Sequence, residues 1–235
     1  MGHRMRSFAV IFIALWAVCG GAVQAQQSPV VVELYTSQGC SSCPSADALL
    51  ARLSERDDVI TLALHVDYWD YLGWKDEFAK AMFTKRQRGY ARAMHSRSIY
   101  TPQMVINGKS NVVGNRSMDV AEVIKAHKSR RQKVHLTLAR NGSGLSIRAD
   151  APKSVGPTEI QLVRYLPSAT VQVGRGENAG KTITYTSIVS DWDVVGTWNG
   201  QGTYDKSVAL GEAGPVVVLV QRPDHGAILA AARLR

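Results

Sequence analysis

Two cysteines three positions apart are the residues in this chain best suited to chemistry. Cys40 and Cys43 lie in a Cys-Ser-Ser-Cys-Pro run between an apolar strand-like segment at 30–35 and a helix-like segment at 45–53. A thiol at a helix start is surrounded by unpaired backbone N–H groups at the positive end of the helix dipole, which favours the thiolate. A thiolate is the nucleophile of disulfide exchange. The sequence therefore predicts a redox-active disulfide, with Cys40 as the exposed attacking sulfur and Cys43 as the resolving one.

The same pair could instead be a permanent structural disulfide. A bridge that closes so short a loop removes little entropy from the unfolded chain, which favours the redox interpretation. Pro44 is compatible with a helix capped by Cys40, because N–H groups in the first turn have no intrahelical partner. Ser41 and Ser42 could donate hydrogen bonds to a thiolate and stabilise the reduced form, which favours an oxidant.

Glu33 is the one charged residue in the apolar segment before the cysteines. Because an ionised carboxylate is costly to bury, Glu33 is either an acid that shuttles a proton to Cys43 or a hydrogen-bonded strand residue near the sheet edge. Two thiolates also suit Cu(I), with His95 as a third ligand, so a copper-binding or metallochaperone-like protein is an alternative function. No zinc-quality ligand set or dinucleotide fingerprint is present, and we expect no cofactor.

Residues 1–25 are typical of a secretory signal peptide. Arg4 and Arg6 precede an apolar stretch at 8–18, and small residues lead up to the expected cleavage site. That stretch is too short to span a bilayer, and no later one approaches the roughly 18 apolar residues that a membrane helix needs. We expect a secreted, periplasmic protein without a membrane span after cleavage, in a compartment where disulfides persist.

The chain is basic, with a formal net charge of +9, which falls to about +7 once the two arginines of the signal are removed. Basic residues gather at 85–97 and at 125–133. Such charge can recruit acidic partners. We interpret both groups as ordinary solvated faces and expect no nucleic-acid partner, because export argues against it and no basic-aromatic stripe is present.

The pattern of elements changes near Arg131. Before it, strand-like and helix-like segments alternate, and after it the pattern is all strand. The expected strands and helices of the first part lie at 30–35, 45–53, 59–66, 77–94, 104–106, 112–113 and 120–128. Those of the second part lie at 134–138, 145–149, 160–166, 182–189, 192–198 and 215–221. The sequence predicts an α/β domain at 26–131, with a central mixed sheet flanked by helices, and a small all-β sandwich-like domain at 132–235.

A second motif is a proline at the entry of a strand. Thr101 and Pro102 precede the apolar segment at 104–106, which Asn107-Gly108 ends with a hairpin turn signal. Together with the cysteine pair, this arrangement resembles the thioredoxin superfamily. The resemblance covers about residues 28 to 128. It implies a thioredoxin-like fold, a cis-proline beside the cysteines at Pro102, and a backbone at Thr101 that pairs with an extended substrate.

A narrower resemblance extends over nearly the whole mature chain. The chain is similar to the DUF1223 family, secreted bacterial thioredoxin-like proteins of unknown function. The segments that carry this similarity are 32–44, 65–74, 100–104 and 176–181. The resemblance implies fold and export, and brings no established reaction with it.

Aromatic residues near the two motifs are candidate substrate-binding side chains. Trp69 and Trp74 could form a wall beside the sulfurs, with Tyr100 beside the proline, although aromatics in such a loop often cap a core instead. His65 is interpreted as a core histidine. The glycine-rich segment at 174–182 lacks the spacing of a phosphate loop, and we interpret it as a structured turn.

These residues favour a periplasmic thiol–disulfide oxidoreductase. Its partners would be protein thiols and disulfides, together with an external redox partner, because the mature chain has no third cysteine. The alternative of a different class is a binding module, in which the β-domain recognises a partner and the thioredoxin-like part is a non-catalytic scaffold.

Overall fold

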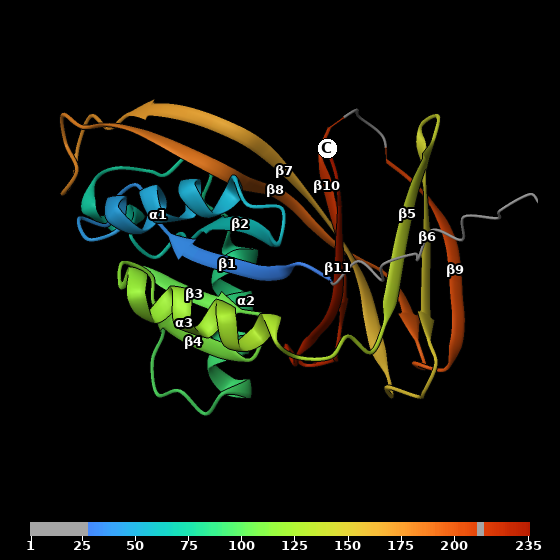
Figure 1. Cartoon of the computed structure of the whole chain (residues 1–235). Helices are drawn as coiled ribbons and strands as arrows, with labels where there is room; N and C mark the ends of the chain where they lie inside the picture. The colour runs from blue at the N-terminus through green and yellow to red at the C-terminus, as the bar shows by residue number, and fades with distance from the viewer. Residues whose placement is uncertain (1–27, 211–213) are drawn as a thin grey trace, which may run out of the picture.

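The computed structural model describes residues 28–210 and 214–235 (Figure 1). The expected signal peptide at 1–25 lies outside the described residues. In chain order, the elements up to residue 128 are β1 (Val30–Thr36), α1 (Pro44–Ser54), β2 (Val59–His65), the 3₁₀ turn η1 (Asp70–Leu72), α2 (Ala81–Ala93), β3 (Gln103–Ile106), β4 (Ser110–Val113) and α3 (Ser117–Lys128). The remaining elements are β5 (His135–Asn141), β6 (Gly144–Ala151), β7 (Thr158–Gln172), β8 (Thr182–Trp198), β9 (Gly202–Ala209), β10 (Val216–Gln221) and β11 (Ile228–Leu234).

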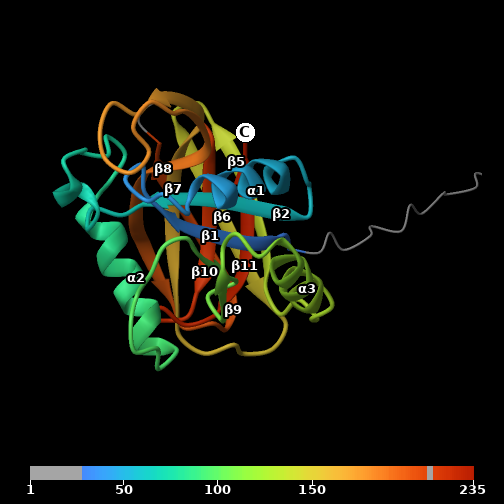
Figure 2. The ribbon, with the colours of Figure 1, turned by 90° about the vertical axis from the view of Figure 1, so that its left-hand side faces the viewer.

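Strand β1 lies in the middle of the first part. Different strands pair with its two edges, and different helices pack on its two faces. It pairs with β2 in parallel and with β3 in antiparallel orientation. Val32 and Leu34 pack with Leu50 of α1 and Ile124 of α3 in one core cluster. The alternate side chains of β1 point to the other face, where they join a cluster that includes residues of α2, β7 and β10. Figure 2 shows α2 and α3 on opposite sides of β1.

The predicted fold class, a helix-flanked thioredoxin-like domain followed by a separate small β-sandwich-like domain, is wrong. The described residues form a mostly β protein with three α-helices, in which one mixed sheet has the strand order β11-β10-β7-β8-β2-β1-β3-β4. Strands from both sides of Arg131 therefore share one sheet, joined where Ala63 of β2 pairs with Ile188 of β8. A second sheet, β5-β6-β9, packs on the far part of the first through the cluster that contains Ile147 and Val218.

The arrangement of the strands could not be predicted from hydrophobic alternation. Alternation identifies a strand and its buried face, but it does not say which neighbour satisfies the strand's backbone hydrogen bonds. In the predicted α/β domain, the edge of β2 that faces away from β1 would carry unpaired N–H and C=O groups. In the structure, β8 pairs with that edge.

The β7–β8 hairpin is the element that reaches from the second part to the first. Its strands are 15 and 17 residues long, and the register shifts between Ile160 and Gln161 and again between Arg164 and Tyr165. These irregularities bend a ladder that would otherwise run straight. Figure 1 shows the hairpin extending over α1. Its connecting segment, residues 173–181, is called the hairpin loop below.

Two further local expectations can be compared with the structure. Asn107 and Gly108 have φ values of 47° and 63° and connect β3 to β4, which confirms the hairpin turn. The helix expected at 77–94 begins later, at Ala81, because the chain turns at Asp76, whose carbonyl accepts the N–H of Ala79. Within the described residues, no helix has the length and apolar character needed to cross a membrane.

Candidate functional site

The two cysteines form a disulfide at the N-terminus of α1, with their Cα atoms 5.4 Å apart. Cys43, rather than Cys40, is the residue that caps the helix, and Pro44 occupies its first turn. The N–H of Cys43 donates to the carbonyl of Cys40 at 3.2 Å, so the pair is closed by a tight turn. Proline is well suited to this position, where the backbone N–H has no helical acceptor.

Both cysteines are buried, so the expectation that the Cys40 sulfur is exposed is wrong. Cys40 is 1% exposed and Cys43 is 0% exposed. The hairpin loop covers the turn that contains them: the Asn178 side-chain amide donates to the carbonyls of Gln38 and Cys40, at 2.9 Å each. Asn178 is itself fully buried. The hairpin loop is therefore bonded to the backbone on both sides of Gly39, next to the cysteine pair.

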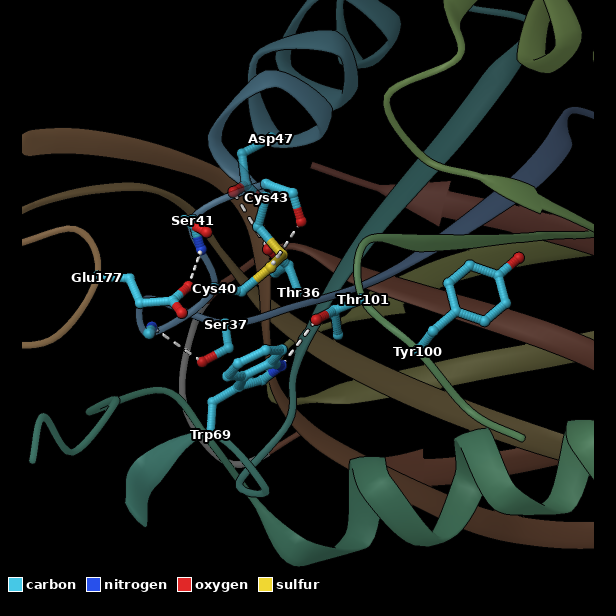
Figure 3. Close-up of a disulfide and its surroundings, with 12 residues drawn as sticks. Thr36, Ser37, Cys40, Ser41, Cys43, Asp47, Trp69, Tyr100, Thr101 and Glu177 are labelled. Atoms are coloured by element: carbon cyan, nitrogen blue, oxygen red, sulfur yellow. Dashed lines mark hydrogen bonds between the residues drawn. A yellow bond between two sulfur atoms is a disulfide. The ribbon is translucent and has the colours of Figure 1, made fainter. Parts of the chain in front are cut away.

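A carboxylate from the same loop lies against the turn between the cysteines. Glu177 accepts the N–H of Ser41 at 3.1 Å (Figure 3), and hydrogen bonding from the Ser41 side chain and then from its backbone lowers the pKa of Glu177. A negative charge here disfavours a thiolate at Cys40. The hydroxyl of Ser42 lies 3.5 Å from the Cys40 sulfur and acts in the opposite direction when it donates.

Asp47 is a buried acid one helical turn after Cys43. It is 4% exposed, and its Oδ2 accepts a hydrogen bond from the Thr36 hydroxyl at 3.1 Å (Figure 3). Its Oδ1 has no hydrogen-bond partner in the described part of the chain. Burial raises the pKa of Asp47 to about 7, against the lowering effects of His65 and the Thr36 hydrogen bond. Asp47 can therefore exchange a proton near neutral pH.

Three more polar side chains are buried near Asp47. His65 and Asp76 are 0% exposed and form a 2.7 Å contact between Nδ1 and Oδ2. The His65 ring lies 4.8 Å from the Tyr185 ring of β8, and Asp47 and Asp76 both raise the pKa of the Tyr185 phenol, after burial as the main cause. We call Asp47, His65, Asp76 and Tyr185 the polar cluster.

The polar cluster is tied to the approach to Cys40. Asp76 accepts the backbone N–H of Gln38 at 2.8 Å, and Trp74 donates its indole N–H to the Gln38 side chain at 2.7 Å. The His65 Nε2 and the Tyr185 hydroxyl lack partners within the described residues. His65, expected to be a core histidine, is buried but has only one of its two ring nitrogens satisfied.

The Thr101–Pro102 element lies close to the disulfide. The peptide bond between the two residues is cis. The Trp69 indole donates to the Thr101 hydroxyl at 2.7 Å. Trp69 also packs against Gly39, because a Cβ built on that glycine would lie 3.2 Å from the Trp69 Cβ. Trp69 thus bridges the residue before Cys40 and the residue before the proline.

Of the other two predicted substrate-binding residues, one lies at the site and one does not. Trp74 contacts the loop before Cys40 through Gln38, and its ring packs on Gly174 of the hairpin loop. Tyr100 is half-buried, but Figure 3 shows its ring pointing away from the disulfide. The structure therefore brings the two tryptophans to the site and not the tyrosine.

Glu33 is held in an ion pair away from α1. Its carboxylate accepts hydrogen bonds from Arg86 at 2.7 and 3.0 Å and from the Tyr90 hydroxyl at 2.6 Å, all inside the core. It lies on the face of β1 that packs against α2, whereas α1 covers the opposite face. This geometry contradicts the proton shuttle to Cys43 and agrees with the alternative of a hydrogen-bonded strand residue, although in the interior of the sheet rather than at its edge.

Sequence reasoning missed three residues of the site. Asp47 was detectable from its i, i+4 spacing to Cys43 on an otherwise apolar helix face. Glu177 and Asn178 belong to the glycine-rich segment that resembles the DUF1223 family. Nothing in their local pattern indicates that a hairpin brings them against the cysteine loop. The sequence separation between the bonded residues is 136 to 140 positions. His95 lies two residues after the end of α2, with a φ of 54°. Among the described residues, no group of three or more side chains could hold a metal ion.

Fold and site define a mostly β protein with a buried disulfide at a helix start, closed by a hairpin from the second half of its own sheet. The chain belongs to the family described as protein of unknown function (DUF1223), whose model matches residues 31–221. Among solved structures, it is similar to protein AGR_C_4864 from Agrobacterium tumefaciens, with 32% identity, a TM-score of 0.78, and coverage of 89% of this chain and 96% of that one. It is also similar to HBP35 of Porphyromonas gingivalis, with 14% identity, a TM-score of 0.59, and coverage of 88% of this chain and 75% of that one, which shows the fold alone. No curated protein matches the chain.

Proposed function

We propose that this protein is an exported thiol–disulfide oxidoreductase whose cysteine pair becomes reactive when the hairpin loop opens. The observation that carries the proposal is the disulfide at the N-terminus of α1, next to the cis peptide before Pro102 and one turn from a buried acid with a pKa of about 7. A purely structural bridge over three residues adds little stability, and it does not require a proton acceptor beside it.

We also propose a distant relation to the thioredoxin superfamily, restricted to the surroundings of the cysteines. Two local features support it: the β1–α1–β2 unit that carries Cys40 and Cys43, and the cis peptide at the entry of β3. The basic and apolar N-terminal sequence supports export to an oxidising compartment.

The proposed exchange runs in two balanced steps. In the reduced protein, the Cys40 thiolate attacks one sulfur of a client disulfide, a mixed disulfide forms, and the other client sulfur leaves as a thiolate. The Cys43 thiolate then attacks the Cys40 sulfur, the protein disulfide forms, and the second client thiolate leaves. Two electrons pass from the cysteine pair to the client, and an external dithiol returns them. The reverse sequence oxidises a client dithiol.

Asp47 is proposed to accept the proton of the Cys43 thiol. Only the thiolate is nucleophilic, so the second step requires a nearby base. A carboxyl group whose pKa is about 7 is half-ionised at neutral pH and can take that proton and return it. The unpartnered Oδ1 of Asp47 is free of competing hydrogen bonds within the described residues.

The hairpin loop is proposed to control access to Cys40. Three hydrogen bonds, two from Asn178 and one to Glu177, hold the loop against the turn. A net contribution of about 1 kcal/mol for each hydrogen bond makes opening rare but reversible. The copper-binding alternative gains no support, because no suitable ligand cluster surrounds the cysteines in the described residues.

The test compares how fast dithiothreitol reduces the disulfide in the wild type and in Asn178→Ala. Removal of two hydrogen bonds weakens the closed state by about 2 kcal/mol, so we expect the rate to rise about thirtyfold. Asn141→Ala, at the exposed end of β5, is the matched control and should leave the rate unchanged. Cys40→Ser should abolish insulin reduction.

A different outcome would establish a structural disulfide. The proposal fails if wild-type protein does not reduce insulin and both asparagine variants are reduced only as fast as the whole protein unfolds. Unfolding rates are measured separately by fluorescence in urea, so loop opening and global unfolding are distinguished.

A further inference from the structure

A strongly basic cavity lies at the end of β1 opposite the disulfide. It has a volume of about 330 Å³ and is lined by Ser28 and Val30, the β3–β4 turn, the end of α3, the linker after α3 and the β10–β11 loop. Seven residues of β1 separate it from the cysteine loop, a distance of about 20 Å for an extended strand. The proposed exchange site does not include it.

The charge of this cavity is one-sided. Among the described residues, six cationic ones line it, and no aspartate or glutamate does. The six are Lys109, Lys128, Arg130, Arg131, Lys133 and Arg222. Within the described residues, Lys128 alone forms an ion pair, with Asp58 at 2.7 Å, while the other five have no carboxylate within salt-bridge distance.

The proximity of these charges affects the pKa of a neighbouring histidine. His127, near the end of α3, also lines the cavity. Burial lowers the pKa of His127, and the positive charges of Arg130 and Lys109 lower it further. The positive potential of the cavity therefore extends to a side chain that is largely covered.

The walls of the cavity are fixed by internal hydrogen bonds. Gln132 in the linker accepts the N–H of Ser28 at 2.9 Å and donates to the carbonyl of Val134 at 2.7 Å. Asn107 accepts the N–H of Val31 at 2.8 Å, which ties the β3–β4 turn to the start of β1. Binding would therefore cost little ordering of the backbone, because these contacts join the linker and the turn to the sheet.

We propose that this cavity binds a small anion that carries phosphate groups. Arginine presents a planar set of donors that matches phosphate oxygens, and three of the six cations are arginines. The volume is in the range of small-molecule sites rather than of a nucleic-acid groove. Ile228, Leu229 and Ala230 of β11 also line the cavity. A free phosphate ester and a phospholipid headgroup share this chemistry.

The experiment measures binding of two probes to the full mature chain. Sodium pyrophosphate is titrated by calorimetry at low salt, and vesicles of phosphatidylcholine with or without phosphatidylglycerol are tested by co-sedimentation. The double variant Arg131→Gln/Arg222→Gln removes two charges from the cavity. The control Lys85→Gln/Arg88→Gln removes two exposed charges from α2.

The expected result is binding that weakens at high salt and that falls at least about tenfold in the cavity variant but not in the control. Pyrophosphate binding identifies a free phosphate compound as the ligand source. Binding of the phosphatidylglycerol vesicles alone, with the same sensitivity to the variant, identifies a lipid headgroup. Absence of binding to both probes, or equal loss in both variants, overturns the proposal. Thermal unfolding of each variant confirms that it is folded.

Discussion

Replacing Asp47 by asparagine should remove a penalty that the folded protein incurs as pH rises. Asp47 is 4% exposed, and burial raises its pKa from 3.8 to about 7. In the unfolded chain, this side chain loses its proton near pH 4, whereas in the folded protein it keeps the proton until about pH 7. Between those values the folded state binds more protons than the unfolded state, so stability falls as pH rises.

The size of the effect follows from the shift. About three pKa units at 1.36 kcal/mol each correspond to about 4 kcal/mol of stability, which is fully present below about pH 4 and lost by about pH 7 to 8. Asparagine has nearly the same shape and no charge to bury. We therefore expect Asp47→Asn to match the wild type near pH 4 and to be more stable by up to about 4 kcal/mol near pH 8.

The assay is urea unfolding of the oxidised protein at several pH values between 4 and 8. Asp58→Asn is the control with the opposite sign, because Arg56 and Lys128 hold the pKa of the Asp58 carboxyl well below its ordinary value. That variant should be less stable than the wild type by a nearly constant amount between pH 4 and 8, because the contribution of Asp58 is lost only below about pH 4. A difference between Asp47→Asn and wild type that does not change with pH would refute the assigned burial of the charge.

Three further outcomes are expected. Arg86→Met leaves Glu33 buried without its partner and should cost about 3–5 kcal/mol of stability in urea unfolding, much of which a second Glu33→Met change should restore. Gly89→Ala, normally favourable in a helix, should destabilise α2 because the added Cβ overlaps the imidazole of His225; the second change His225→Ala should relieve the overlap in thermal unfolding. Glu177→Gln should make the disulfide more oxidising, since it removes a negative charge beside the turn; equilibration with glutathione measures this, and an unchanged potential would contradict the assigned electrostatic effect.

Local sequence patterns were sufficient to predict most elements of the first part. Apolar runs and turn residues placed β1, α1, β2, β3, β4 and α3 close to their observed positions. In the second part, the expected strands at 182–189 and 192–198 are one strand, β8, since the register irregularities opposite it let the ladder continue through the interruption. The sequence did not predict β9, which carries an exposed charged face, or β11, whose Ala230, Ala231 and Ala232 favour a helix as readily as a strand.

The candidate site was predictable where its parts are close in the sequence. The cysteine pair and the disulfide follow from spacing, and Trp69 and Trp74 were candidates for a wall beside the sulfurs, with core packing as the alternative. Burial of the pair was not predictable, because it depends on a pairing between β2 and β8 that joins residues far apart in the chain. Glu33 was assigned the wrong role for the same reason: its partner Arg86 is 53 residues away.

Asn178, whose side chain donates to the Cys40 carbonyl, lies 138 positions after Cys40 in the chain. A nascent chain that emerges N-terminus first therefore presents both thiols unshielded until synthesis has passed β8. The cysteine pair is therefore free of this loop in the incomplete chain and buried in the folded molecule. A disulfide formed before the β7–β8 hairpin folds would not require the hairpin loop to open.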